Sequence, residues 1–270
     1  MVDSPPSDPS ADAARQRAYL ARIGIELYVV RGQEAATHEA TAPTVAEGTR
    51  ESQPAAAQPQ SSPEAAAPAP GNDAEVAGLG WDSLEQTIRQ CRRCPLHETR
   101  TQGVPGVGSR SAGLMLIGEA PGAEEDRRGE PFVGRAGQLL DEMLRAIGLE
   151  RAQVYITNIL KSRPPRNRDP QPGEVAACEP YLRRQIELLQ PALIVALGRI
   201  SAQNLLRSNL PLGRLRGEWH AYGPLETPLL ATYHPAYLLR NPADKRKAWH
   251  DLKQIRSRLR QAADVAEAAP

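Results

Sequence analysis

Residues 114–122 read LMLIGEAPG, and this stretch decides the fold. The apolar run 114–117 is followed by a turn with two glycines and a proline, a pattern typical of a buried strand that ends in a tight loop. Similar apolar runs occur at 154–156 (VYI), 193–197 (LIVAL) and 229–232 (LLAT), each bounded by turn residues. The sequence therefore predicts four short buried strands.

Helical patterns separate these strands. Apolar residues recur every three to four positions at 136–147, 174–189, 201–206 and 243–259. Alternating strands and helices predict an α/β fold of three layers, α/β/α, around a central four-stranded parallel sheet. Ligands of such sheets bind beyond the carboxyl ends of the strands, so the residues that follow each strand are the candidates for function.

The chain divides by charge and composition. Residues 1–80 carry 5 basic and 11 acidic side chains, and 33–80 are almost entirely small or polar residues, which predicts a disordered leader with one apolar island at 14–32. Residues 81–260 carry 28 basic and 19 acidic side chains and form the predicted globular domain. Residues 261–270 are expected to be a flexible tail. The net charge of +1 thus hides a basic domain, which favours a polyanionic ligand.

Composition excludes several classes. No apolar stretch is long enough to cross a membrane, and the polar, acidic start lacks the order of a secretory signal. Three cysteines are too few for a disulfide-built secreted domain. We therefore expect a monomer in the cytoplasm with no membrane contact.

Three polar side chains follow predicted strands. Glu119 and Ala120 follow the first strand, Asn158 the second and His234 the fourth, so the fold brings them to one rim. An amide offers a donor and an acceptor to a heterocycle, and an imidazole can donate to developing negative charge. Phe132, the only phenylalanine, lies in a loop where it could stack on a planar base.

Four segments carry a resemblance. They are CRRC at 91–94, GEAPGAEEDRRGEPFVGRAGQLLDEML at 118–144, YITNILKSRPPRNRDPQPGEVAACEPYL at 155–182 and TYHPAYLLR at 232–240. In this order and spacing they resemble the family 4, iron–sulfur uracil-DNA glycosylases. The resemblance implies an enzyme that flips uracil out of single- or double-stranded DNA and hydrolyses its N-glycosidic bond, leaving an abasic site.

The resemblance also implies roles. Phe132 would stack on uracil, Asn158 would bind its polar edge, and His234 would stabilise the uracil anion. Glu119 and Ala120 would line the sugar side. Glu125 would lie beside C5 and help to exclude thymine, and which of the two carboxylates orients the water stays open. Predicted DNA contacts are Arg163, Arg166, Tyr237, Leu238, Leu239, Arg240, Lys245 and Arg246, with one leucine as a wedge.

The cysteines depart from the family in one place. The family holds a [4Fe-4S] cluster with four cysteines, and three of the positions are Cys91, Cys94 and Cys178. The fourth is Ser162, in KSRPP instead of KCRPP. The alternatives are that Ser162 binds the fourth iron, that water or His97 takes its place, or that the site holds a [3Fe-4S] cluster or none. Buried thiols without metal and a zinc site are further alternatives.

Other functions remain open from the sequence. One alternative is a non-catalytic iron–sulfur protein that binds nucleic acid. Another is a relative that crosslinks to the abasic sugar through a histidine, although residues 160–173 contain none. No lysine stands at a strand end as an obvious nucleophile, so a monofunctional glycosylase is expected.

The island at 14–32 lies outside the resemblance. It faintly resembles the amino-terminal peptide of the psi subunit of bacterial clamp loaders, which implies a replication partner. Packing of the island onto its own domain is an equal alternative.

Overall fold

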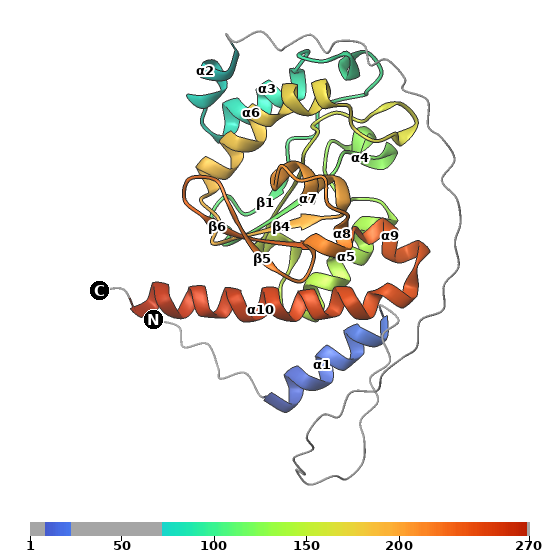
Figure 1. Ribbon diagram of the computed structural model, residues 1–270, viewed down its shortest axis with the longest axis vertical. Helices are drawn as coiled ribbons and strands as arrows, with labels where there is room; N and C mark the ends of the chain where they lie inside the picture. The colour runs from blue at the N-terminus through green and yellow to red at the C-terminus, as the bar shows by residue number, and fades with distance from the viewer. Residues whose placement is uncertain (1–8, 23–71, 269–270) are drawn as a thin grey trace, which may run out of the picture.

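The computed structural model describes residues 9–22 and 72–268, and a six-stranded sheet forms its centre (Figure 1). The strand order is β1-β3-β2-β4-β6-β5. The strands are β1 (Val107–Gly108), β2 (Leu114–Gly118), β3 (Tyr155–Asn158), β4 (Leu193–Leu197), β5 (Trp219–Tyr222) and β6 (Thr227–Thr232).

The four predicted strands are β2, β3, β4 and β6, and their pairings are all parallel. The two edge strands are antiparallel and were not predicted. Strand β1 has only two residues, and β5 alternates between exposed and partly buried residues. Neither therefore has the continuous apolar run that marks a strand covered on both faces.

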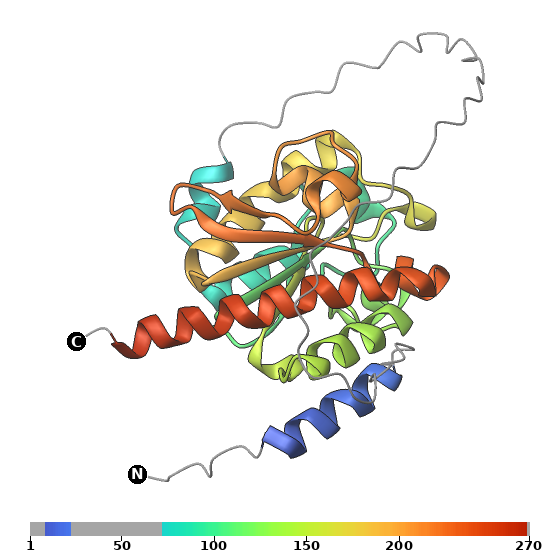
Figure 2. The same ribbon diagram turned by 60° about the horizontal axis from the view of Figure 1, so that its bottom comes forward.

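Helices cover both faces of the sheet, as the three-layer prediction requires. Side chains of β2 alternate between the faces: Leu116 packs with one set of helices and Met115 with the other. The first set consists of α5 (Arg135–Ala146), α9 (Pro235–Arg240) and α10 (Lys245–Ala268). The second consists of α3 (Trp81–Gln90), α6 (Pro172–Leu189), α7 (Arg199–Leu205) and α8 (Leu212–Leu215). Figure 2 shows α10 crossing the first face.

Two helices lie in the predicted leader. Helix α1 (Pro9–Arg22) packs on α5, where Leu20 is 1% exposed and Arg22 pairs with Glu142 at 2.9 Å. Helix α2 (Asn72–Ala77) packs on α6 through Val76. The domain therefore includes residues before 81, because these helices bury apolar side chains against it. The rest of the predicted linker, residues 33–71, lies outside the described residues.

At the other end of the chain, α10 continues to Ala268, so most of the predicted tail is helical. Short elements complete the fold: α4 (Ala123–Arg128), η1 (Pro95–Glu98), η2 (Arg151–Gln153), η3 (Pro165–Asn167) and η4 (Pro242–Asp244). Among the helices described, none is long and apolar enough to cross a membrane.

Candidate active site

The carboxyl ends of the parallel strands bring the predicted residues together. Gly118 ends β2 opposite Asn158, which ends β3, and His234 follows β6. A Cβ atom on Gly118 would lie 2.3 Å from Asn158 Oδ1 and 2.7 Å from the ring of Phe132. Only a glycine therefore lets the amide and the aromatic ring meet at the end of β2.

Phe132 is held in an unusual conformation. Its φ of 54° lies in the left-handed region, which is uncommon for a bulky residue and costs of order 1–3 kcal/mol. The Glu125 carboxylate holds the adjoining loop, since it accepts hydrogen bonds from the backbone N–H groups of Val133 (2.9 Å), Gly134 (3.1 Å) and Gly122 (3.1 Å). Glu125 thus has a structural task that the sequence did not reveal, and its place beside C5 of uracil stays a prediction.

His234 faces Phe132 with a defined tautomer. The two rings stack with centroids 5.4 Å apart. His234 caps α9, and its Nδ1 accepts from the N–H of Ala236 at 3.1 Å, so the proton of the neutral ring is on Nε2. Burial, with a contribution from Arg240, lowers the pKa of His234 to about 4. At neutral pH the site therefore holds an uncharged N–H donor.

The pKa of Glu119 is shifted in the opposite direction from that of His234. Burial, reinforced by the nearby charge of Asp169 and opposed by Arg199, raises the pKa of Glu119 to about 7. Asp169 and Arg199 pair with each other at 2.8 Å. This carboxyl group can exchange a proton near neutral pH, which suits a residue that orients or deprotonates water.

Four of the predicted DNA-binding residues, Tyr237, Leu238, Leu239 and Arg240, lie on α9. Leu238 is 1% exposed and belongs to the core, whereas Leu239 is 37% exposed. Leu238 is therefore not available for a DNA contact in this structure, and Leu239 is the exposed leucine of the pair. Tyr237 stacks on Tyr233 with centroids 5.0 Å apart and donates to Asp244 at 2.6 Å.

The predicted basic contacts lie after β3, at the end of α9 and at the start of α10. Arg163 follows β3 and donates to Asn167 Oδ1 at 2.8 Å, while Arg166 is exposed in η3. Arg240 ends α9 and is exposed, as is Arg246 in the first turn of α10 beside the partly buried Lys245.

The three cysteines lie where α3, η1 and α6 meet. Cys91 follows α3, Cys94 precedes η1 and the buried Cys178 lies within α6. Cys94 and Cys178 pack around the same apolar residues, Leu96 and Leu160. Burial, with Cys94 and Cys91 nearby, raises the pKa of Cys178 to about 12.

The donors at this place fit some metal groups better than others. Zn–S bonds of about 2.3 Å would draw thiolate ligands to within about 4 Å of one another. Among the described residues, no three His, Cys, Asp or Glu side chains are grouped to hold a metal ion in this way. A four-iron cluster places each cysteine on a different iron and so needs wider spacing. Three thiols and a buried hydroxyl, Ser162, match its number of donors.

Arg100 is a residue of this region that the sequence did not reveal. Its guanidinium donates to Ser162 Oγ and, at 2.6 Å, to the carbonyl of Cys91. A cation beside a hydroxyl favours its alkoxide form, the form in which serine binds a metal. Burial raises the pKa of the Cys94 thiol, and the nearby charge of Arg100 opposes that shift.

Lys161 was not predicted as a functional residue, although it begins the KSRPP segment, because the sequence does not show which groups its side chain contacts. It is 1% exposed, and burial lowers its pKa to about 7. Its ammonium group donates to residues at the end of β3.

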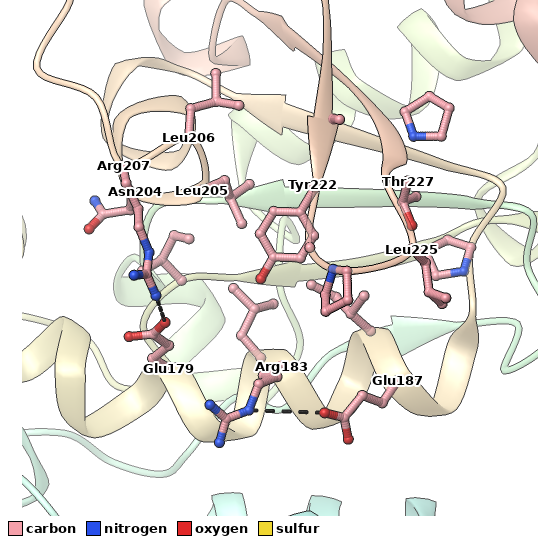
Figure 3. Close-up of a pocket in the computed structure, with 18 of the residues that line it drawn as sticks. Glu179, Arg183, Glu187, Asn204, Leu205, Leu206, Arg207, Tyr222, Leu225 and Thr227 are labelled. Atoms are coloured by element: carbon pink, nitrogen blue, oxygen red, sulfur yellow. Dashed lines mark hydrogen bonds and ion pairs between the residues drawn. The ribbon is translucent and has the colours of Figure 1, made fainter.

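A separate cavity lies at the opposite edge of the sheet. It has a volume of about 1150 Å³ and is lined by α6, the end of α7 and the β5–β6 hairpin. Figure 3 shows Tyr222 and Leu225 facing Arg183 and Glu187 across it. Most of these segments adjoin the amino ends of β4 and β6, and although Ile159 contributes to the lining, Glu119, Asn158 and His234 do not.

Comparison with known proteins defines the class. The family model of the uracil DNA glycosylase superfamily matches residues 105–253, more than half of the chain. This range contains the strand ends that carry Glu119, Asn158 and His234. The fold and the match place the chain in that superfamily.

Relatives narrow the assignment. The type-4 uracil-DNA glycosylase of Archaeoglobus fulgidus is 48% identical over 181 residues, which cover 64% of this chain and 90% of that protein. The type-4 enzyme of Thermotoga maritima is 40% identical, over 64% of this chain and 92% of that protein. A type-5 uracil-DNA glycosylase of Thermus thermophilus is 32% identical, over 46% of this chain and 71% of that protein. The chain belongs to the type-4 uracil-DNA glycosylase family.

Proposed function

We propose that this chain is a monofunctional DNA-repair glycosylase that hydrolyses the N-glycosidic bond of uracil in single- or double-stranded DNA. The observation that carries the proposal is the convergence of Phe132, Asn158 and His234 around Gly118. An aromatic face, an amide and an N–H donor are the three elements that bind a flipped pyrimidine.

The base pocket works by complementarity. Phe132 stacks on uracil, and base–aromatic stacking contributes about 1–3 kcal/mol per base. The Asn158 amide accepts from N3–H and donates to O4, which excludes cytosine because cytosine has a donor at position 4. Glu125 fixes the loop that presents Phe132. Whether the same side chain also approaches C5 is tested by comparing uracil with thymine in a Glu125→Gln variant.

His234 stabilises the leaving group. As the N-glycosidic bond breaks, negative charge accumulates on uracil O2, and the neutral Nε2–H donates to it without a proton transfer. Removing a donor of this kind typically costs 10²–10³ in rate. Arg240, whose charge lowers the pKa of the imidazole, adds favourable electrostatic potential for the anion.

Glu119 acts on the water. The sugar becomes positively charged at C1′ as the base leaves, and a carboxylate near it stabilises this charge and orients the water that adds there. Glu119 is preferred over Glu125 because the Glu125 carboxylate already accepts three backbone hydrogen bonds. Ala120, next in the chain, leaves space for the sugar.

DNA is held around this pocket through phosphate contacts and one wedge. Arg163, Arg166, Arg240, Lys245 and Arg246 bind phosphates without sequence preference, as an enzyme that searches any DNA for uracil requires. Leu239 fills the space that the flipped nucleotide leaves, and Tyr237 supports α9 through its hydrogen bond to Asp244.

An iron–sulfur cluster accompanies this activity in our proposal. Cys91, Cys94 and Cys178 would hold it, with Ser162 as the fourth ligand activated by Arg100. A bound cluster would supply a structural crosslink between α3, η1 and α6. It would lie behind the loops that follow β2 and β3, because Ala120 and Leu160 pack in the same group as Cys178.

The leader has two candidate roles. Leu20 is buried on α5, which supports docking of residues 9–22 on their own domain. Binding of the island at 14–32 to a replication protein such as a clamp loader is the alternative, and residues 23–32 lie outside the described part of the chain. Failure of a peptide of residues 1–35 to capture any replication protein in a pull-down would remove this alternative. We also propose that the protein is a monomer in the cytoplasm, where a reducing environment keeps thiols available to bind a cluster.

One experiment tests the function. The protein is incubated with uracil-containing single- and double-stranded oligonucleotides, and the products are analysed for alkali-labile sites and covalent adducts. A monofunctional glycosylase gives alkali-labile sites only. Covalent adducts would indicate the crosslinking relative, and binding without cleavage would indicate the non-catalytic nucleic-acid-binding protein.

A further inference from the structure

A buried lysine lies directly behind Asn158. Lys161 is 1% exposed, and its ammonium group has three donors. All three are used: Lys161 Nζ lies 2.7 Å from Thr157 Oγ1, 2.7 Å from the carbonyl oxygen of Asn158 and 2.7 Å from Gln185 Oε1. The side chain therefore spans the turn that follows β3 and ties it to α6.

Burying the ammonium group of Lys161 lowers the stability of the fold, which a purely structural side chain would avoid. The three acceptors are uncharged, and no ion pair found in the described residues includes Lys161. Burial of an ammonium group without a counter-ion costs several kcal/mol, and an apolar side chain of the same length would fill the space without that cost. The polar contacts themselves, rather than the volume, are the feature to explain.

The contacts determine the orientation of a peptide plane. The carbonyl of Asn158 belongs to the peptide that follows the base-binding residue, so fixing it fixes the backbone from which the Asn158 side chain projects. The next two residues are also held, because the N–H of Ile159 donates to Gly118 O at 2.9 Å and that of Leu160 to Glu119 O at 3.0 Å. The turn is thus anchored to the catalytic loop on one side and to Lys161 on the other.

The acceptors of Lys161 are themselves fixed. Thr157 Oγ1 donates to Pro105 O at 2.7 Å, and Gln185 Nε2 donates to the same oxygen at 2.8 Å. Gln185 also reaches the hydroxyl of Tyr155 at 3.2 Å. A network in which every member is satisfied is rigid, and a rigid support keeps a binding group in its productive geometry.

We propose that Lys161 is a positioning residue for uracil recognition, whose three hydrogen bonds hold the backbone of Asn158 so that its amide meets the edge of the base. The inference rests on the proposed function, in which Asn158 binds uracil. It adds that the selectivity for uracil depends on a side chain that never touches the base.

Two DNA probes test it in the full-length protein. One carries a 2′-fluorinated deoxyuridine, which retains uracil but resists cleavage, and the other a tetrahydrofuran abasic analogue, which has no base. In Lys161→Met we expect the affinity for the uracil probe to fall about tenfold, the effect of one impaired hydrogen-bonded contact, with unchanged affinity for the abasic probe. In an Asn158→Ala background Lys161→Met should add no further loss, because the lysine acts through that residue.

Matched variants separate positioning from stability. Thr157→Val removes one acceptor while keeping the shape of the side chain, and it carries the test if Lys161→Met does not fold. Ser201→Ala is the control, since Ser201 Oγ donates to Ile117 O at 2.6 Å near the same edge but has no link to Asn158. An unchanged ratio of the two affinities in Lys161→Met, or an equal fall in Ser201→Ala, would overturn the inference. A wild-type protein that does not prefer the uracil probe would instead refute the proposed function.

Discussion

The ring of His234 lies against the ring of Phe132, with centroids 5.4 Å apart and planes inclined by 30°. The two residues come from loops more than a hundred positions apart, and each loop depends on a close backbone approach. A Cβ on Gly137 would lie 1.8 Å from Phe132 O, and one on Gly198 would lie 2.9 Å from His234 Cβ. The pocket wall is therefore fixed by glycines as much as by the side chains that it displays.

The contribution of base stacking on Phe132 can be measured with a substitution that removes the aromatic ring but keeps an apolar side chain. Phe132→Leu should lower kcat/KM for uracil excision by about 5- to 150-fold, because base–aromatic stacking contributes about 1–3 kcal/mol. Single-turnover cleavage of a single-stranded oligonucleotide measures it. Trp219→Leu, which alters an exposed aromatic residue on the edge strand β5, is the control and should cleave at the normal rate.

Neutrality of His234 predicts a particular pH response. A pKa of about 4 leaves the imidazole uncharged throughout the neutral range, so protonation of His234 should reduce the rate only as the pH falls through about 4. His234→Asn should lower the cleavage rate by about 10²–10³ at pH 7.5. Dependence of the wild-type rate on a group of pKa 6.5 that disappears in His234→Asn would contradict the neutral imidazole.

The pH dependence of the excision rate near neutral pH should reflect the ionisation of Glu119. Its pKa is raised to about 7, and the carboxylate is the form that orients water, so the single-turnover rate should rise with pH through about 7 and then level. Glu119→Gln should be about 10²-fold slower and lack this step. Glu124→Gln, at an exposed position of α4, keeps the step in the expected result. A step retained in Glu119→Gln would assign it to another group.

These sites differ in how far the sequence could predict them. Glu119, Asn158 and His234 follow apolar runs, and the topology of a parallel sheet brings strand ends to one edge, so their convergence was predictable. The sequence could not predict which of Leu238 and Leu239 is buried, because both lie in a six-residue helix with too few turns to show a periodic apolar face.

The supporting residues were less accessible to prediction. Lys161 and Arg100 act through backbone carbonyls and a serine hydroxyl, partners that no spacing rule connects. Helix α2 lies at the end of an Ala- and Pro-rich stretch, and the contact of Val76 with α6 outweighs its composition. Composition therefore did not indicate that this helix packs on the domain.

The fourth cluster ligand can be tested by restoring the family residue. Ser162→Cys should raise the iron content and the visible absorbance of the purified protein, because a thiolate binds iron more strongly than a serine oxygen. Arg100→Met in the wild-type background should lower both, since it removes the cation beside Ser162 Oγ. Arg92→Met, an exposed neighbour of Cys91, is the control. If Ser162→Cys leaves iron content and absorbance unchanged, Ser162 is not at the fourth position.

Leu238 and Leu239 form an internal control for the wedge. Leu238 packs in the core, so Leu238→Ala should lower the free energy of unfolding by about 2–5 kcal/mol. Leu239 is exposed, so Leu239→Ala should leave stability nearly unchanged while slowing excision from double-stranded DNA, where the wedge replaces the flipped nucleotide. Excision from single strands, which need no such replacement, should change little. Thermal unfolding and parallel cleavage of the two substrates measure these effects, and equal slowing on both substrates by Leu239→Ala would show that Leu239 does not act as a wedge.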